Sequence, residues 1–214
     1  MIDTDLARIE RASYRSATDS GLWDILLASI VAEFAIAPLL SVYLGDFWSS
    51  AVFLPVFAVV ILLIRVVQAR VVRPRIGIVE FARPRRQRFL MLTVVMLVVN
   101  IVAFIVGLVA FTRAPVAQGP IVSFGLAMVF LVGFSLASFF LEIPRVFFYG
   151  LLLAAATLVG EALWVRGHAS HHGFPIVFGV CSVVILVSGI VRFVRFLLRA
   201  QGGKGRQAVE GADD

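Results

Sequence analysis

Hydrophobic residues in this chain gather into six long runs, which short polar or turn-forming segments separate. A helix needs about 20 apolar residues to cross the hydrocarbon core of a bilayer. The pattern therefore predicts an all-α integral membrane bundle of six transmembrane helices. The predicted spans are 22–44, 48–67, 89–111, 121–141, 146–165 and 175–198.

Turn-forming residues support this division. Gly45-Asp46, Gly119-Pro120 and Gly173-Phe174-Pro175 stand where the chain must reverse. The loops between spans 1 and 2, 3 and 4, and 5 and 6 are short, so the spans pair as three hairpins. An inverted repeat of three spans would suggest a transporter, but the two halves show no convincing similarity.

The predicted transmembrane domain covers residues 21–200, and a polar segment flanks it at each end. Residues 1–20 form an N-terminal cytoplasmic arm, for which an interfacial helix and a solvated arm are both compatible with the pattern. Residues 201–214 are rich in glycine and charged residues, which predicts a disordered cytoplasmic tail.

Composition agrees with burial in lipid. The chain has 214 residues, of which 61% are hydrophobic and 15% charged, and a mean hydropathy of +1.01. Soluble domains carry roughly 45–50% apolar and about 25% charged residues. The one cysteine, Cys181, cannot form an intrachain disulfide or a thiolate metal cage. We expect no cofactor.

Positive charge is unevenly distributed across the predicted spans. Seventeen of the nineteen Lys and Arg residues fall on one side, which predicts a multi-pass protein of the cell (inner) membrane with both termini cytoplasmic. Arg192, Arg195 and Arg199 share one face of the last helix, where they should reach lipid phosphates. We expect the bilayer and its anionic headgroups as partners. Motifs for binding nucleic acid are lacking.

The segment between spans 2 and 3 is the most basic part of the chain. A β-favouring run, 76–81, lies between Pro74 and Pro84, which predicts a partly extended cytoplasmic segment. Residues 70–88 are either a docking surface for a cytoplasmic protein partner or acidic lipid, or a loop that only sets topology. The arginines concerned are Arg73, Arg75, Arg83, Arg85, Arg86 and Arg88.

The stretch Arg-Pro-Arg-Ile-Gly-Ile-Val-Glu-Phe, residues 73–81, resembles a segment of small uncharacterised prokaryotic polytopic membrane proteins. Those proteins place Pro-Arg-Ile-Gly-x-Val in a basic cytoplasmic loop. The resemblance covers these nine residues and the layout of the spans. It implies a membrane location and carries no activity.

Ionisable residues inside spans are candidates for function, because lipid makes them costly. Glu33 lies about 16 Å into span 1, with Ser29 and Ala37 on its row. Asn100 lies at a similar depth in span 3, so a Glu33–Asn100 hydrogen bond is predicted. This pair is a structural contact, part of a proton- or ion-coupled pathway, or a site for lipid or a small apolar ligand.

Glu161 lies toward the outer end of span 5, before a loop that carries His168, His171 and His172. A carboxylate near three imidazoles could bind zinc or another transition metal. The adjacent histidines, however, cannot both easily point inward. We therefore interpret all three as solvated loop residues and expect no metal.

Enzyme chemistry finds no support in these residues. A serine nucleophile needs a histidine at membrane depth, yet all three histidines share one outer loop, and no nucleotide-binding motif is present. The preferred function is a non-enzymatic accessory or scaffold protein that acts through residues 70–88. The alternative is a small proton- or ion-coupled secondary transporter or channel using Glu33 and Asn100. Association of identical chains stays open.

Overall fold

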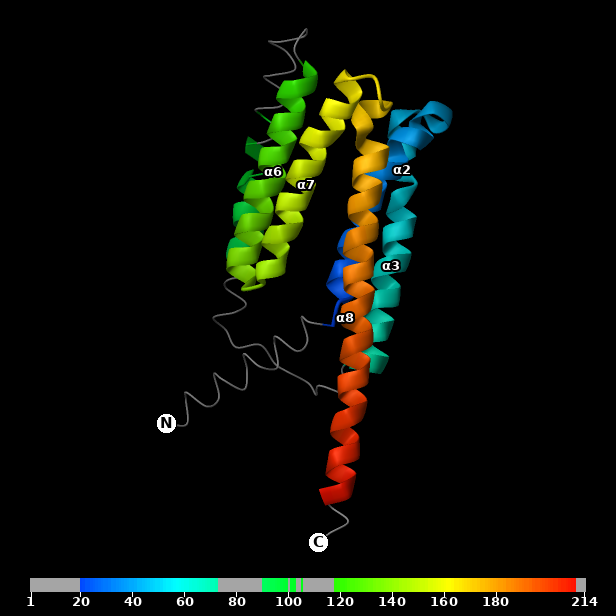
Figure 1. Cartoon of the computed structure of the whole chain (residues 1–214), viewed down its shortest axis with the longest axis vertical. Helices are drawn as coiled ribbons and strands as arrows, with labels where there is room; N and C mark the ends of the chain where they lie inside the picture. The colour runs from blue at the N-terminus through cyan, green and yellow to red at the C-terminus, as the bar shows by residue number, and fades with distance from the viewer. Residues whose placement is uncertain (1–19, 73–89, 100, 103–104, 106–117, 211–214) are drawn as a thin grey trace. The chain divides into compact units, whose positions relative to one another are not determined.

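A computed structural model describes residues 20–72, 90–99, 101–102, 105 and 118–210. Its helices, with the labels of Figure 1, are α2 (Leu22–Ala51), α3 (Phe53–Val67), α6 (Gln118–Leu141), α7 (Pro144–Val165) and α8 (Phe174–Glu210). A π-helical turn, η1 (Gln68–Val72), follows α3, and a 3-10 turn, η2 (His171–Gly173), precedes α8.

Within these residues, five helices are long and apolar enough to cross a membrane. They are Leu22–Gly45, Phe47–Val72, Gly119–Leu141, Pro144–Val165 and His171–Arg199. They coincide with five of the predicted spans. Of the predicted span 89–111, the structure describes a short apolar helix, Leu90–Val99. The number of six spans therefore stays a prediction.

Large apolar and aromatic side chains are exposed along the described helices, as lipid contact requires. Tyr43 is 86% exposed and Trp48 66%, and both lie near the glycine turn in α2. Trp23, near the start of α2, and Trp164, near the end of α7, are also exposed. Tryptophan and tyrosine are typical of the membrane–water interface. These helices indicate a polytopic membrane protein.

The chain divides into two compact units. Unit 1 comprises Met1–Ile30, Val52–Glu80 and Ser182–Asp214, and unit 2 comprises Val31–Ala51 and Phe81–Cys181. The helices α2 and α8 each contribute residues to both units.

In unit 2, α6 and α7 lie side by side and are joined by only two residues (Figure 1). The first of these, Glu142, has a φ of 56°, and the amide of Ile143 donates to Ser138 O over 3.2 Å. This bond closes the end of α6. Pro144 then begins α7 at a position where a missing N–H costs nothing. The result is a tight helical hairpin.

The core of unit 2 combines close helix approach with aromatic packing. A Cβ atom on Gly150 would clash with the Cβ of Phe134, so the glycine lets α7 approach α6. The ring of Phe178, which is completely buried, lies 5.4 Å from that of Phe34 and 6.0 Å from that of Phe130. Three helices therefore meet around one buried phenylalanine.

The core of unit 1 holds the start of α2 against the middle of α8. Gly21 and Gly189 touch so closely that a Cβ on Gly21 would overlap Gly189 O. The buried hydroxyl of Ser182 donates to Ala28 O over 2.9 Å. Further along, an apolar cluster brings α3 and η1 into contact with α8. Its members are Leu22, Ile64 and Val72, with Ile25, Leu26, Val60, Val67, Phe193 and Phe196 packed against them.

The ends of the spans differ from the sequence pattern in two places. The helix α8 extends as far as Glu210, into the predicted tail 201–214. Once a helix has formed, each further residue adds a hydrogen bond, so α8 continues through its glycines. The second span continues beyond Val67 through η1 to Val72. Except for Ser20, the arm 1–20 lies outside the described residues, and so does the predicted extended run 76–81.

The packing of α6 against α7 can be tested at Gly150. We expect Gly150→Ala to lower the unfolding temperature in detergent, because overpacking a helix contact costs roughly 1–3 kcal/mol. Gly125→Ala on α6 is the control, since a Cβ there meets no atom within 4 Å. Equal unfolding temperatures for the two variants would show that this contact does not stabilise the fold.

Candidate functional site

The sequence-predicted polar residues fall into two groups in the structure. Glu33 is half-buried on α2, but Asn100 lies outside the described residues, so the predicted hydrogen bond between them is not tested. The six arginines predicted for the basic segment between spans 2 and 3 also lie outside the described residues. Glu161, in contrast, is described with its contacts and forms the centre of a polar cluster.

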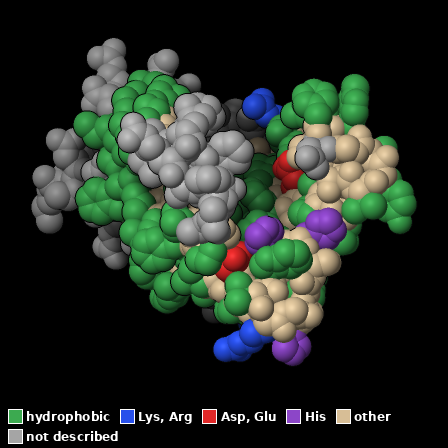
Figure 2. All heavy atoms as spheres, turned by 90° about the horizontal axis from the view of Figure 1, so that it is seen from above, with side chains coloured by type: hydrophobic (Ala, Val, Ile, Leu, Met, Phe, Trp, Pro, Cys, Tyr) green, Lys and Arg blue, Asp and Glu red, His purple; other side chains and the backbone are tan. Residues whose placement is uncertain are grey.

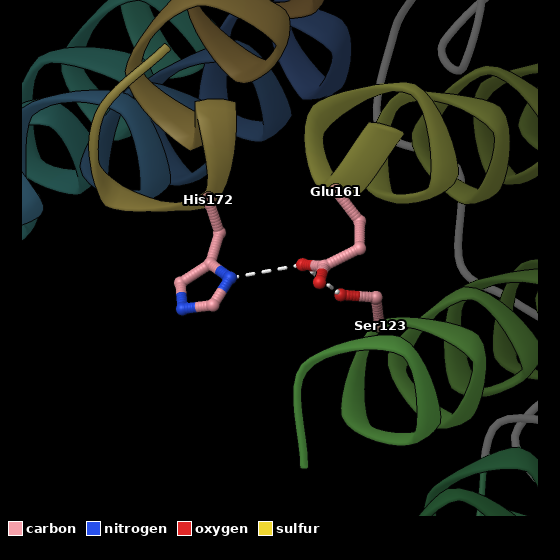
Figure 3. Close-up of polar contacts among 3 residues, drawn as sticks. All are labelled: Ser123, Glu161 and His172. Carbon is pink, nitrogen blue, oxygen red and sulfur yellow. Dashed lines mark hydrogen bonds and ion pairs between the residues drawn. The ribbon is translucent and has the colours of Figure 1, made fainter. Parts of the chain in front are cut away.

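Three helical elements of unit 2 supply this cluster. The hydroxyl of Ser123, on α6, donates to Glu161 Oε2 over 3.0 Å, and His172 Nδ1 lies 2.9 Å from the same oxygen (Figure 3). The Glu161 side chain is 9% exposed, whereas that of His172 is 45% exposed. A buried carboxylate therefore has one buried neighbour and one neighbour open to the surroundings. Figure 2 shows a histidine beside an acidic side chain, with hydrophobic side chains around them.

Glycines at three positions make room for the cluster. A Cβ on Gly119 would lie 2.5 Å from Glu161 Oε1, so its absence admits the carboxylate next to α6. A Cβ on Gly173 would lie 2.6 Å from Gly160 O, and one on Gly160 would lie 2.8 Å from His172 O. The two backbones thus touch directly, which places His172 beside the residue that follows Gly160.

The histidine is held by an uncommon backbone. His171 has a φ of 48°, His172 of 53° and Gly173 of 66°, so three successive residues adopt left-handed geometry. This geometry costs roughly 1–2 kcal/mol for a residue other than glycine. The ring of Trp164 packs against one side of the His172 ring, with 4.9 Å between the two ring centroids. The contacts of His172 with Glu161 and Trp164 offset the free-energy cost of its left-handed backbone.

The position of the hydrogen in this contact depends on the protonation of both groups. When Glu161 is ionised, its carboxylate only accepts hydrogen bonds, and His172 Nδ1 then carries the hydrogen. The other ring nitrogen, Nε2, points away from Glu161 (Figure 3). When Nδ1 carries the hydrogen, Nε2 holds a lone pair. In the part of the chain that the structure describes, no group of three His, Cys, Asp or Glu side chains is placed to hold a metal ion.

His172 thus contacts Glu161 in addition to being 45% exposed, a contact that the expectation of solvated loop histidines did not include. The sequence places Glu161 and the histidine loop at the same end of spans 5 and 6, but it does not identify the histidine that turns inward. The left-handed turn at 171–173 makes this selection. His168, by comparison, is exposed.

One ion pair in unit 1 was missed by the sequence interpretation. Arg192 Nε lies 3.7 Å from Asp24 Oδ2, and the Asp24 side chain is 4% exposed. Arg192 is thus directed to a buried carboxylate as well as to the lipid surface. A signal was present, because Asp24 follows Gly21 by three residues and Arg192 follows Gly189 by three. The contact between Gly21 and Gly189 brings the two helices close enough for Asp24 and Arg192 to pair.

Comparison of the chain with protein-family models, with curated proteins and with solved structures finds no match. Any functional proposal therefore depends on the described residues and their contacts.

The buried hydrogen bond from Ser123 can be tested by deletion of one hydroxyl. Ser123→Ala should lower stability by about 1–3 kcal/mol, because Glu161 loses a donor that water cannot replace. Ser135→Ala is the control on the same helix, since its hydroxyl bonds only to Leu131 O one turn earlier. Unfolding in detergent measures both, and a similar small effect for the two variants would contradict the role of Ser123.

Proposed function

We propose that this chain is a non-enzymatic accessory or scaffold protein of the cell (inner) membrane that binds anionic lipid headgroups through an arginine-rich end. The observation that supports this proposal lies in unit 1. There, the end of α3 with η1 and the second half of α8 share one apolar cluster, which includes Ile64, Val72 and Phe193.

Four exposed arginines lie close in sequence to residues of this cluster, and we call them the arginine collar. They are Arg65, Arg70, Arg195 and Arg199. Each follows or precedes a residue of the cluster by one to three positions along its helix. Guanidinium groups match phosphate oxygens in a bidentate manner and stay charged at any physiological pH. A phosphate headgroup is therefore the ligand that fits the collar.

The free energy of attraction between these arginines and anionic lipid supports lipid binding by the collar, in addition to anchoring of the helix ends. A basic residue close to an anionic membrane surface contributes about 1 kcal/mol, so four together favour anionic over neutral lipid by a few kcal/mol. The chain that follows Val72 adds the predicted basic segment, with six further arginines. If this segment lies at the same surface, it enlarges the collar toward an acidic cytoplasmic partner.

The alternative of a transporter depends on Glu33 and Asn100. Within the described residues, Glu33 has no hydrogen-bond partner, and Asn100 is not among them. The collar offers four exposed guanidinium groups, which match phosphate oxygens. We therefore prefer lipid binding as the function and assign no role to Glu33.

Lipid binding by the collar can be measured on the purified protein. Arg195→Gln/Arg199→Gln should weaken binding of phosphatidylglycerol roughly thirtyfold, because two contributions of about 1 kcal/mol are lost. Native mass spectrometry with phosphatidylglycerol and phosphatidylcholine counts the bound lipids. The control with equal charge loss is Arg113→Gln/Arg166→Gln, at the predicted outer side. Equal losses in both variants would contradict a specific collar.

The proposed orientation has its own test. In a Cys181→Ser background, His168→Cys should react with an impermeant maleimide in intact cells, and Gln201→Cys should react only after lysis. The reason is that arginine-rich segments stay on the cytoplasmic side. Labelling of Gln201→Cys in intact cells would place the collar outside and overturn the orientation.

A further inference from the structure

The contact between Glu161 and His172 joins the two ends of the α7–α8 connection, which we define as residues 166–173. Its amides are otherwise held by few bonds. Those of Gly167 and His168 donate to Trp164 O and Leu163 O, and that of Gly173 donates to Ser170 O, each over 2.9 Å. Since His171 and His172 hold left-handed geometry, the connection should relax if His172 leaves Glu161.

The charge of this contact depends on one proton. With Glu161 ionised and His172 neutral, the pair carries one net negative charge, and with His172 protonated it becomes a neutral ion pair. A hydrogen bond between two ionised partners is stronger than one with a single ionised partner. Histidine is the side chain that changes charge between pH 5 and pH 8. The strength of the contact therefore depends on whether the imidazole of His172 is protonated.

Among the described residues, the neighbouring elements supply few competing charges. The α6 helix presents Ser123 and Gly119 to Glu161, and it contains no charged residue along Gln118–Leu141. The other ionisable side chains on the connection are Arg166, His168 and His171. The side chain that directly faces the carboxylate from the α8 side is His172. The proton on this ring therefore determines the charge next to Glu161.

We propose that Glu161 and His172 form a proton-binding pair that holds the α7–α8 connection closed in acid and loosens it as pH rises. The ligand is a proton, and the element that responds is the strained turn at His171–Gly173. This site lies in unit 2 and does not depend on the arginine collar of unit 1.

Hydrogen exchange of the whole protein in detergent tests this proposal. Protection factors, corrected for the intrinsic effect of pH on amide exchange, are measured at pH 5.5 and pH 8 for the amides of Gly167, His168 and Gly173. We expect protection to be on the order of tenfold higher at pH 5.5 in the unmodified protein. In Glu161→Gln and in His172→Gln, this ratio should fall to about one.

His168→Gln is the matched control, because it removes an exposed histidine from the same connection and should keep the tenfold ratio. Amides in the middle of α6 report whether each variant is folded. If Glu161→Gln does not fold, the half-exposed His172→Gln still decides. Protection in the unmodified protein that does not change with pH would overturn the proposal. A tenfold ratio of protection factors that persists in His172→Gln would also overturn it. Loss of this ratio in His168→Gln would do the same.

Discussion

Hydrocarbon offers no hydrogen bonds, so each polar group that this chain carries into a bilayer must find its partner within the protein. This constraint explains the described polar contacts. Ser182 on α8 donates to a carbonyl on α2, and Thr157 donates to Leu153 O within α7. Ser123 and His172 meet the carboxylate of Glu161. The polar side chains of these contacts link helices or return to their own backbone, while many large apolar side chains of the described helices are exposed.

Glycine–glycine contacts make these polar partners reachable. In unit 1, Gly21 touches Gly189, and one turn further along each helix Asp24 meets Arg192. In unit 2, Gly160 touches Gly173, and the adjacent residues Glu161 and His172 meet. Without a Cβ, two backbones approach closely enough for neighbouring charged side chains to span the remaining gap. In both units, a glycine–glycine contact thus lies next to a pair of ionisable side chains, and these residues differ between the units.

Much of the fold could be predicted from the hydrophobic pattern. Five spans agree with described helices to within a few residues at most boundaries, because lipid demands long uninterrupted apolar runs. The ends were less predictable. The glycines of 201–210 favoured disorder by composition, yet α8 extends through them. The reason is that helix propagation depends on the preceding turns, which a local pattern does not include.

The candidate site was predictable only in part. The position of Glu161 near the histidine loop followed from span lengths, since both lie at the same end of neighbouring helices. The choice of His172 depended on positive φ angles at 171–173, and a sequence interpretation has no access to them. The Asp24–Arg192 pair was missed for a related reason. Arginine near a span end usually reaches lipid phosphate, and only the glycine contact directs this one to a carboxylate.

The two polar regions differ in how they respond to their surroundings. Arginine stays charged across physiological pH, so the proposed attraction of the collar for phosphate would vary mainly with salt and lipid composition. A carboxylate with an imidazole partner changes its net charge by one when a single proton binds. Glu161 is buried, so that change occurs where charge is poorly screened. Binding of one proton at this pair can therefore alter the strained turn at 171–173. The same proton on a fully exposed side chain would leave that turn unchanged.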